Sequence, residues 1–265
     1  MSATGVGIDE FARLAARVRR LSGVDLLQYK RGQMERRVRT FAERRGTPDL
    51  TLYAARLQSE PAELEALLDR VTINVSQLWR HESQWAEIAR LLSAMGGRDG
   101  YRIRAWSAGC SYGAEAYTLA ATCAGVLGAG AHVEIHGTDL DARMIARANA
   151  GAFSAADART APRAALERWF VPADGGWQAR PELRRMVSFA TGDLLRMPIA
   201  ERRWDLILCR NTVIYFTDKI RDELHARLAH ALRPGGYLVV GGTERVTDPR
   251  STKLEPAHPF IYRKS

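Results

Sequence analysis

The stretch W-S-A-G-C-S-Y-G, residues 106–113, decides the fold that this sequence predicts. It follows the apolar segment 102–107, which we interpret as a buried β-strand, and it leads into a predicted helix over 112–126. Glycine has no Cβ, so Gly109 and Gly113 allow the backbone to approach a ligand closely. A helix that begins here directs free N–H groups to the same place, which favours binding of a carboxylate or a phosphate.

Strand and helix segments alternate on the carboxyl side of this loop. We predict strands at 132–138, 187–191, 204–209 and 237–240, helices at 141–150 and 219–232, and a closing strand around 260–262. This alternation is typical of a mostly parallel sheet with helices on both faces. The segment 153–186 is too long for a simple loop, so we expect an inserted helix and a small β element there.

On the amino side of the loop, apolar residues recur at spacings of three and four, which predicts a small all-helical domain over 1–71. A connector with one further helix, reaching from Trp79 to Gly96, would cover 72–100, and the sheet domain would cover 101–265. Residues 1–50 hold eleven Lys or Arg against six Asp or Glu, within a chain of formal charge +9. This bias predicts an acidic partner.

Asp139 identifies the class of ligand. It follows the predicted strand 132–138, where a carboxylate can accept hydrogen bonds from ribose hydroxyls. The loop lacks G-x-G-x-x-G, and the gap from Gly113 to Asp139 exceeds the roughly 20 residues of the dinucleotide fingerprint. Both features disfavour NAD and favour S-adenosylmethionine, a nucleoside with a carboxylate and no pyrophosphate. Asn211 and Tyr215 follow the strand 204–209, so we expect them to face the same ligand.

Five segments, in order along the chain, resemble the motifs of the chemotaxis receptor methyltransferases (CheR), which are protein-glutamate O-methyltransferases. They are T-I-N-V-S-Q-L-W-R (72–80), W-S-A-G-C-S-Y-G-A-E (106–115), T-D-L-D (138–141), C-R-N-T-V-I-Y-F (209–216) and G-G-T-E (241–244). The resemblance covers nearly the whole chain. It implies an α/β fold: a Rossmann-like methyltransferase sheet with a small N-terminal all-helical domain and a small inserted β-subdomain.

The resemblance also implies roles for individual residues. The donor S-adenosylmethionine, with S-adenosylhomocysteine as product, would be contacted by Asn74, Ser76, Arg80, Glu115, Asp139, Asp193, Leu194, Asn211 and Thr212, beside Gly109 of the loop. Arg80 and Tyr215 would lie nearest the transferred methyl group and the substrate carboxylate, as the catalytic residues. The acidic cytoplasmic helices of methyl-accepting chemoreceptors would be recognised by Arg36, Arg37, Arg39, Arg44 and Arg45.

Some positions depart from the family pattern and leave alternatives open. Ala114 replaces a Glu, Ala116 a Pro, Gly242 a His and Asp193 an Asn. One alternative is a nucleic-acid methyltransferase, which the charge favours but the absence of D/N-P-P-Y/F after 204–209 disfavours. The other is an adaptor that binds S-adenosylmethionine without turnover, consistent with Ala114 and Gly242. The insert is short, which disfavours docking of a receptor's C-terminal peptide.

The remaining sequence features set expectations about environment. The three cysteines are widely spaced, with no C-x-x-C pair, so we predict no metal site. No segment is apolar enough to span a bilayer, and residues 1–10 lack the pattern of a signal peptide. We therefore expect a cytoplasmic monomer with no direct membrane insertion and no nucleic-acid partner.

Overall fold

The computed structural model describes residues 9–71, 76–96, 102–128 and 131–265. The chain divides into two compact units. The helical unit comprises Met1–Asn74 and Tyr215–Ile220, and the sheet unit comprises Val75–Ile214 and Arg221–Ser265. Among the described residues, no helix is both long enough and apolar enough to cross a bilayer.

The described part of the helical unit contains four α-helices. They are α1 (Glu10–Ser22), α2 (Arg31–Arg44), α3 (Leu50–Ser59) and α4 (Pro61–Val71), with a 3-10 turn η1 (Leu26–Gln28) after α1. Asp9 caps α1 by accepting a hydrogen bond from the N–H of Ala12, and α1 ends at Gly23 with φ +79°. Phe11, Val18 and Leu21 of α1 recur at the apolar spacings of three and four; Phe11 and Val18 are fully buried, whereas Leu21 is 39% exposed.

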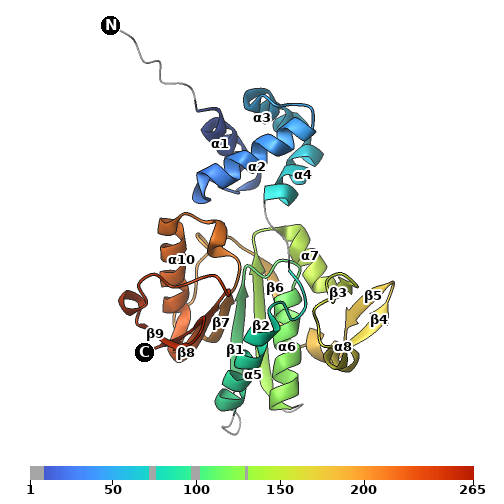
Figure 1. Ribbon diagram of the computed structural model, residues 1–265, viewed down its shortest axis with the longest axis vertical. Coiled ribbons are helices and arrows are strands. Elements are labelled where there is room, and N and C mark those ends of the chain that lie inside the picture. The colour runs from blue at the N-terminus through green and yellow to red at the C-terminus, as the bar shows by residue number, and fades with distance from the viewer. Residues whose placement is uncertain (1–8, 72–75, 97–101, 129–130) are drawn as a thin grey trace. The chain divides into compact units, whose positions relative to one another are not determined.

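The sheet unit is built on a seven-stranded sheet with the order β6-β2-β1-β7-β8-β10-β9 among the described residues (Figure 1). The strands are β1 (Arg102–Ala108), β2 (His132–Asp139), β6 (Val187–Thr191), β7 (Trp204–Cys209), β8 (Leu232–Val240), β9 (Leu254–His258) and β10 (Ile261–Lys264). The first five strands in that order are parallel, and β10 is antiparallel to β8 and β9. The predicted mostly parallel sheet with a closing strand near 260–262 is confirmed.

Helices cover this sheet. They are α5 (Glu82–Gly96), α6 (Ala114–Leu127), α7 (Ala142–Ala150) and α10 (Asp218–Ala231). Helix α6 packs against β1, β2, β6 and α5, and α7 packs against β2 and β6. Because α6 is enclosed in this way, most of its residues are buried, including Ala114, Tyr117 and Leu119.

The insert forms a separate three-stranded antiparallel sheet with the order β3-β5-β4 (Figure 1). It consists of β3 (Ala152–Ser154), α8 (Arg163–Trp169), β4 (Phe170–Ala173), β5 (Gly176–Ala179) and α9 (Pro181–Arg184). The β4–β5 hairpin turns at Asp174 and Gly175, whose φ angles of +43° and +73° suit a two-residue hairpin turn. The expected inserted helix and small β element are therefore present.

Some element boundaries differ from the prediction. Strand β8 begins at Leu232 rather than at Tyr237, because Leu232 already pairs with Trp204 and a register shift after Trp204 accommodates R-P-G-G. Helix α6 begins at Ala114 rather than Tyr112, since Gly113 takes φ +85°. Trp79, which we placed with the connector helix, precedes α5 in a turn with φ +53°.

Candidate functional site

The strand order reverses at β1, which has β2 on one side and β7 on the other. In open parallel sheets, ligands bind beyond the carboxyl ends of the strands at such a point. The loops that follow β1 and β7 touch there. A Cβ placed on Gly109 would lie 2.5 Å from Oγ1 of Thr212, so this glycine is needed for close approach of the two loops.

The loop after β1 aims the beginning of α6 at this edge. Gly109, Ser111 and Gly113 all have left-handed φ angles, of +81°, +49° and +85°. The N–H groups of Gly109 and Cys110 donate to the carbonyl of Thr138 at 2.8 and 3.0 Å, which fixes the loop to β2. No side chain in the described part of the chain caps the helix at Gly113, so N–H groups of its first turn remain available to an anion.

Asp139 ends β2 and joins two loops. Its Oδ2 accepts the N–H of Ser111 at 2.7 Å, and its Oδ1 accepts the N–H of Asp141 at 3.0 Å. Burial raises the pKa of Asp139, while the backbone N–H groups act in the opposite direction. Each carboxylate oxygen has a second lone pair, so the group can also accept hydrogen bonds from ribose hydroxyls.

Glu115, in the first turn of α6, is held by a residue that the sequence analysis did not select. Its Oε1 accepts the hydroxyl of Ser107 at 2.7 Å, and its Oε2 pairs with Nη1 of Arg210 at 3.2 Å. The Arg210 side chain is only 2% exposed and also donates to Oε1 of Gln84 and to the carbonyl of Arg80. An arginine directly after the buried strand β7 requires such partners, and this was the available signal.

Glu244 is a second residue that we missed. It is 4% exposed and accepts the backbone N–H groups of Asn211 at 2.8 Å, Val213 at 3.2 Å and Gly241 at 2.5 Å. These bonds fix the loop after β7, in which Asn211 has φ +59°. Burial raises the pKa of Glu244. The G-G-T-E motif contained this signal, but its carboxylate was not assigned a role.

The other predicted donor contacts lie on neighbouring segments. Asp193 and Leu194 follow β6, where the N–H of Gly192 donates to the carbonyl of Asp139 at 2.9 Å. The carbonyl of Ser76 accepts the hydroxyl of Tyr112. The carbonyl of Arg80 accepts hydrogen bonds from Arg210 and Trp85, while its side chain is partly exposed. Asn74 lies outside the described residues.

A buried hydroxyl in the loop after β1 shows whether the residues at this edge fit the donor. Oγ of Ser111 is buried and has no hydrogen-bond partner within the described part of the chain. A buried hydroxyl without a partner is costly and is commonly satisfied by a ligand or water. It lies in the same loop as the uncapped start of α6, and the N–H of Ser111 bonds to Asp139. The residues therefore fit a molecule that carries both a carboxylate and a ribose.

A cavity of about 210 Å³ lies elsewhere in the sheet unit. Its walls include Trp106, His136 and Trp204, which are inside strands, and part of the segment between β6 and β7. Trp106 pairs with His136 across β1 and β2, so these walls belong to the face of the sheet rather than to its carboxyl edge. None of the predicted site residues that the structure describes lines this cavity.

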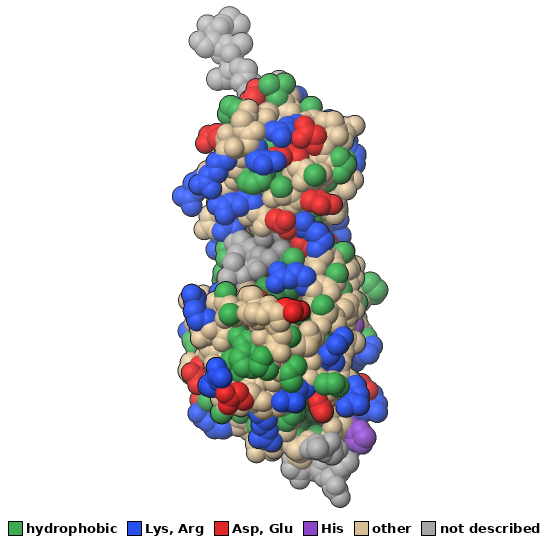
Figure 2. Space-filling view, turned by 90° about the vertical axis from the view of Figure 1, so that its right-hand side faces the viewer, with side chains coloured by type: hydrophobic (Ala, Val, Ile, Leu, Met, Phe, Trp, Pro, Cys, Tyr) green, Lys and Arg blue, Asp and Glu red, His purple; other side chains and the backbone are tan. Residues whose placement is uncertain are grey.

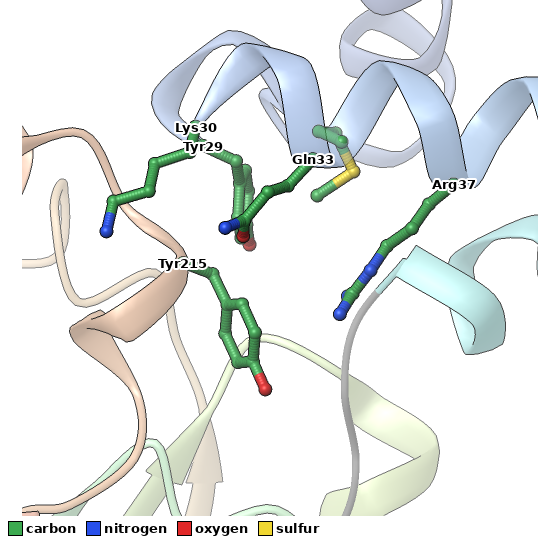
Figure 3. Close-up of a pocket in the computed structure, with 6 residues that line it drawn as sticks. Tyr29, Lys30, Gln33, Arg37 and Tyr215 are labelled. Atoms are coloured by element: carbon green, nitrogen blue, oxygen red, sulfur yellow. The ribbon is translucent and has the colours of Figure 1, made fainter. Parts of the chain in front are cut away.

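Tyr215, predicted as catalytic, belongs to the helical unit. Its carbonyl accepts the N–H of Lys30 at 2.8 Å, and the guanidinium carbon of Arg37 lies 5.1 Å from its ring centroid. Figure 3 shows Gln33 and Arg37 reaching from α2 towards Tyr215. Together with Tyr29 and Met34 these residues line a small hollow.

The five arginines predicted to recognise substrate fall into two groups. Arg45 pairs with Glu63 at 2.6 Å, and the Glu63 side chain is 1% exposed. Hydrogen bonding from Arg45 lowers the pKa of Glu63. Arg39 pairs with Glu35 at 2.9 Å. The other three, which form no ion pair within the described residues, are Arg36, Arg37 and Arg44.

Comparisons with known proteins agree on one family. The family described as CheR methyltransferase, SAM binding domain matches residues 74–260, and the CheR methyltransferase all-alpha domain matches residues 9–72. A chemotaxis protein methyltransferase of Listeria innocua is 32% identical over 94% of this chain and 94% of its own length. An uncharacterized 104.1 kDa protein of Rhodobacter capsulatus is 36% identical over 84% of this chain, which spans 24% of that protein.

A third relative carries a different pathway name. The probable biofilm formation methyltransferase WspC of Pseudomonas aeruginosa is 30% identical over 89% of this chain and 56% of its own length. The family matches together cover both the helical and the sheet parts of the chain. The chain therefore belongs to the CheR methyltransferase family and is an S-adenosylmethionine-dependent methyltransferase.

Proposed function

We propose that this enzyme transfers the methyl group of S-adenosylmethionine to glutamate side chains of chemoreceptors, forming glutamyl methyl esters. The observation that carries the proposal lies at the carboxyl edge of the sheet. There Asp139, Glu115 and the Ser111 hydroxyl, which has no hydrogen-bond partner among the described residues, lie at or beside the beginning of α6. Relatives named chemotaxis protein methyltransferases support this choice of substrate. The nucleic-acid alternative has no comparable support.

The donor would be held by groups from three loops. The first turn of α6 would bind its carboxylate, Asp139 its ribose hydroxyls, and Asn211 and Thr212, fixed by Glu244, would line the loop after β7. When bound, the donor supplies an electrophilic methyl group attached to a sulfonium. Glu115 is anchored by Ser107 and Arg210, so its position does not depend on the ligand.

The acceptor needs no general base. A glutamate side chain has an ordinary pKa of about 4.3 and is ionised at neutral pH, so its oxygen can attack directly. The enzyme's contribution is then to orient the two reactants and to exclude water. We assign orientation of the acceptor carboxylate to Arg80, because a guanidinium can bind both carboxylate oxygens. Tyr215, in the helical unit, stays a predicted catalytic residue on the strength of the family resemblance.

The helical unit would recognise the acidic surface of the receptor. Arg36, Arg37 and Arg44 of α2 are better suited to this than Arg39 and Arg45, which already have carboxylate partners. Met34, Val38 and Ala42 form the buried face of α2. Arg36 and Arg44 are exposed, whereas Arg37 is half-buried and packs against the ring of Tyr215. Figure 2 shows a group of Lys and Arg side chains at one edge of the helical unit.

The test is a transfer assay with labelled donor and a receptor cytoplasmic fragment. Label that stays on the receptor through gel separation and is released by mild base supports the proposal, because methyl esters hydrolyse readily. A fragment whose acceptor glutamates are changed to glutamine is the control. Label in RNA would support the nucleic-acid alternative, and donor binding without transfer would support the adaptor.

The pathway is a separate question. Because one relative is named a probable biofilm formation methyltransferase, the acceptor could belong to a receptor array that does not control motility. The experiment incubates the enzyme and labelled donor with a cell extract and then identifies the protein that carries base-labile label. The identity of that protein decides between a chemotaxis receptor and a receptor of another pathway. A labelled receptor of either pathway is consistent with glutamate methylation.

A further inference from the structure

Residues 76–81 carry two of the proposed site residues, Ser76 and Arg80, on a strained backbone. Trp79 and His81, on either side of Arg80, have φ angles of +53° and +59°. Non-glycine residues rarely adopt this left-handed region, so it persists only where neighbouring groups enforce it. The groups that hold this segment therefore determine where Arg80 lies.

The insert holds the middle of the segment. The N–H of Leu78 donates to the carbonyl of Asp157 at 2.9 Å, and the carbonyl of Leu78 accepts the hydroxyl of Thr160 at 3.0 Å. Leu78 is fully buried, and the ring of Trp79 lies edge-on to Phe170 of β4, with centroids 6.1 Å apart. Both backbone groups of Leu78 are thus satisfied by the insert and not by a helix or a sheet.

Tyr112, in the loop after β1, links the insert to the beginning of the same segment. Its hydroxyl has one hydrogen and two acceptors, the carbonyl of Ser76 and Oδ1 of Asp157, the latter at 2.9 Å. Oδ2 of Asp157 accepts the N–H and the hydroxyl of Ser154 at 2.9 and 2.8 Å, so Asp157 is itself fixed. The guanidinium carbon of Arg147 lies 4.4 Å from the Tyr112 ring centroid.

We propose that Tyr112, Asp157 and Thr160 are positioning residues that hold residues 76–80 so that Ser76 and Arg80 are presented to the reactants. The inference rests on the proposed function. It makes the insert part of the catalytic apparatus regardless of whether it docks a receptor peptide.

Two conservative variants test whether Tyr112 and Thr160 position residues 76–80. Tyr112→Phe removes the hydroxyl but keeps the ring beside Arg147, and Thr160→Val removes the bond to Leu78 at nearly constant volume. Loss of one such hydrogen bond should weaken S-adenosylhomocysteine binding, or lower kcat, by about three- to tenfold. The matched control is Tyr117→Phe inside α6, whose hydroxyl donates to the carbonyl of Ala148 at 3.1 Å and not to residues 76–80. It should change either quantity less than about twofold.

A combined variant separates positioning from general destabilisation. If Tyr112 acts by positioning Ser76 and Arg80, adding Tyr112→Phe to the pair Ser76→Ala and Arg80→Ala should weaken S-adenosylhomocysteine binding less than it does in the wild type. Equal effects in both backgrounds, or an effect of Tyr117→Phe as large as that of Tyr112→Phe, would overturn the proposal. S-adenosylhomocysteine binding is measured without the acceptor, so this test does not depend on the identity of the substrate. If the variants change binding as expected but the wild-type enzyme does not methylate receptors, the positioning proposal stands and the proposed function fails.

Discussion

Arg80 is the residue whose replacement should separate transfer from folding. Its carbonyl is fixed by Arg210 and Trp85, and these bonds do not need its side chain. We expect Arg80→Ala to lower kcat for receptor methylation by about 100-fold, because an acceptor that is no longer oriented reacts slowly. Initial rates and the melting temperature should be measured together. Arg90→Ala, on a 70% exposed side chain of α5, is the control. Unchanged turnover of Arg80→Ala would refute the assignment.

Arg210 and Glu115 form a buried pair, and removal of either should leave the other uncompensated. The Glu115 side chain is 12% exposed and the Arg210 side chain is 2% exposed. Arg210→Met should lower the free energy of unfolding by about 3–5 kcal/mol, whereas the further change Glu115→Gln should restore part of the loss. Urea denaturation of the two single variants and the double variant gives the coupling. Strictly additive effects would mean that the pair is not coupled.

The residues that were predicted differ in kind from those that were missed. Asp139 and Glu115 could be found because each stands at a fixed place relative to a strand or a helix, and the motif letters match. Arg210 and Glu244 act through partners far away in sequence: Arg210 through Gln84 and Glu115, and Glu244 through Asn211 and Val213. A sequence shows that a charge follows a buried strand, but not which group neutralises it.

Helix α10 contains a histidine that should make the enzyme sensitive to acid. His225 is 1% exposed, and neither ring nitrogen has a hydrogen-bond partner within the described residues. Burial, and to a lesser extent Arg221, lowers the pKa of His225 from 6.5 to about 4. Between these two pH values the unfolded chain binds a proton that the folded chain does not, so stability falls as the pH is lowered through this range, by at most about 3 kcal/mol.

A comparison of two histidine variants checks whether His225 causes this dependence of stability on pH. His225→Leu removes the titrating group at similar volume and should flatten the dependence of the unfolding free energy on pH between 6.5 and 4. His230→Leu, on the exposed side of the same helix, should leave the dependence as in the wild type. An equal slope in His225→Leu and wild type would show that other groups cause the acid sensitivity.

Among the elements, those with a strong pattern were predictable. Strands β1, β2, β6 and β7 are short segments with alternating or continuous apolar residues, and each was placed within about one residue. Strand β9 was missed, because only Leu254 of its five residues is buried and Pro256 lies at its centre. The start of β8 was missed for a related reason: R-P-G-G reads as a turn, yet its backbone follows β7 across a register shift.

At the scale of the whole molecule, each of the two compact units is made of two separate stretches of the chain. The segment Tyr215–Ile220 is packed with the helical unit, although it follows β7 directly in sequence. The carbonyl of Gln28 accepts the N–H of Thr217 at 3.0 Å, and Tyr29 packs against Phe216 with ring centroids 5.1 Å apart. Such long-range pairing has no signature in local periodicity.

The distribution of charge over the whole molecule predicts how methylation responds to salt. The chain has a net charge of +9, concentrated towards its first 50 residues, and the proposed partner is acidic. The Debye length falls from about 10 Å at 0.1 M to about 3 Å at 1 M ionic strength, so attraction between exposed charges is screened. We expect kcat/KM for the receptor to fall by about tenfold between 0.05 and 0.5 M NaCl.

Donor binding supplies an internal reference for this salt dependence. S-adenosylhomocysteine is a zwitterion without net charge and binds at the sheet edge, so its Kd should change by less than about twofold over the same range. The combined change of Arg36, Arg37 and Arg44 to glutamine should remove most of the salt dependence of kcat/KM. The matched control changes three exposed arginines of the sheet unit, Arg90, Arg163 and Arg250, to glutamine. An equal loss of salt dependence in both triple variants would show that net charge, and not the α2 surface, attracts the receptor. A salt-independent kcat/KM in the wild type would exclude electrostatic recognition altogether.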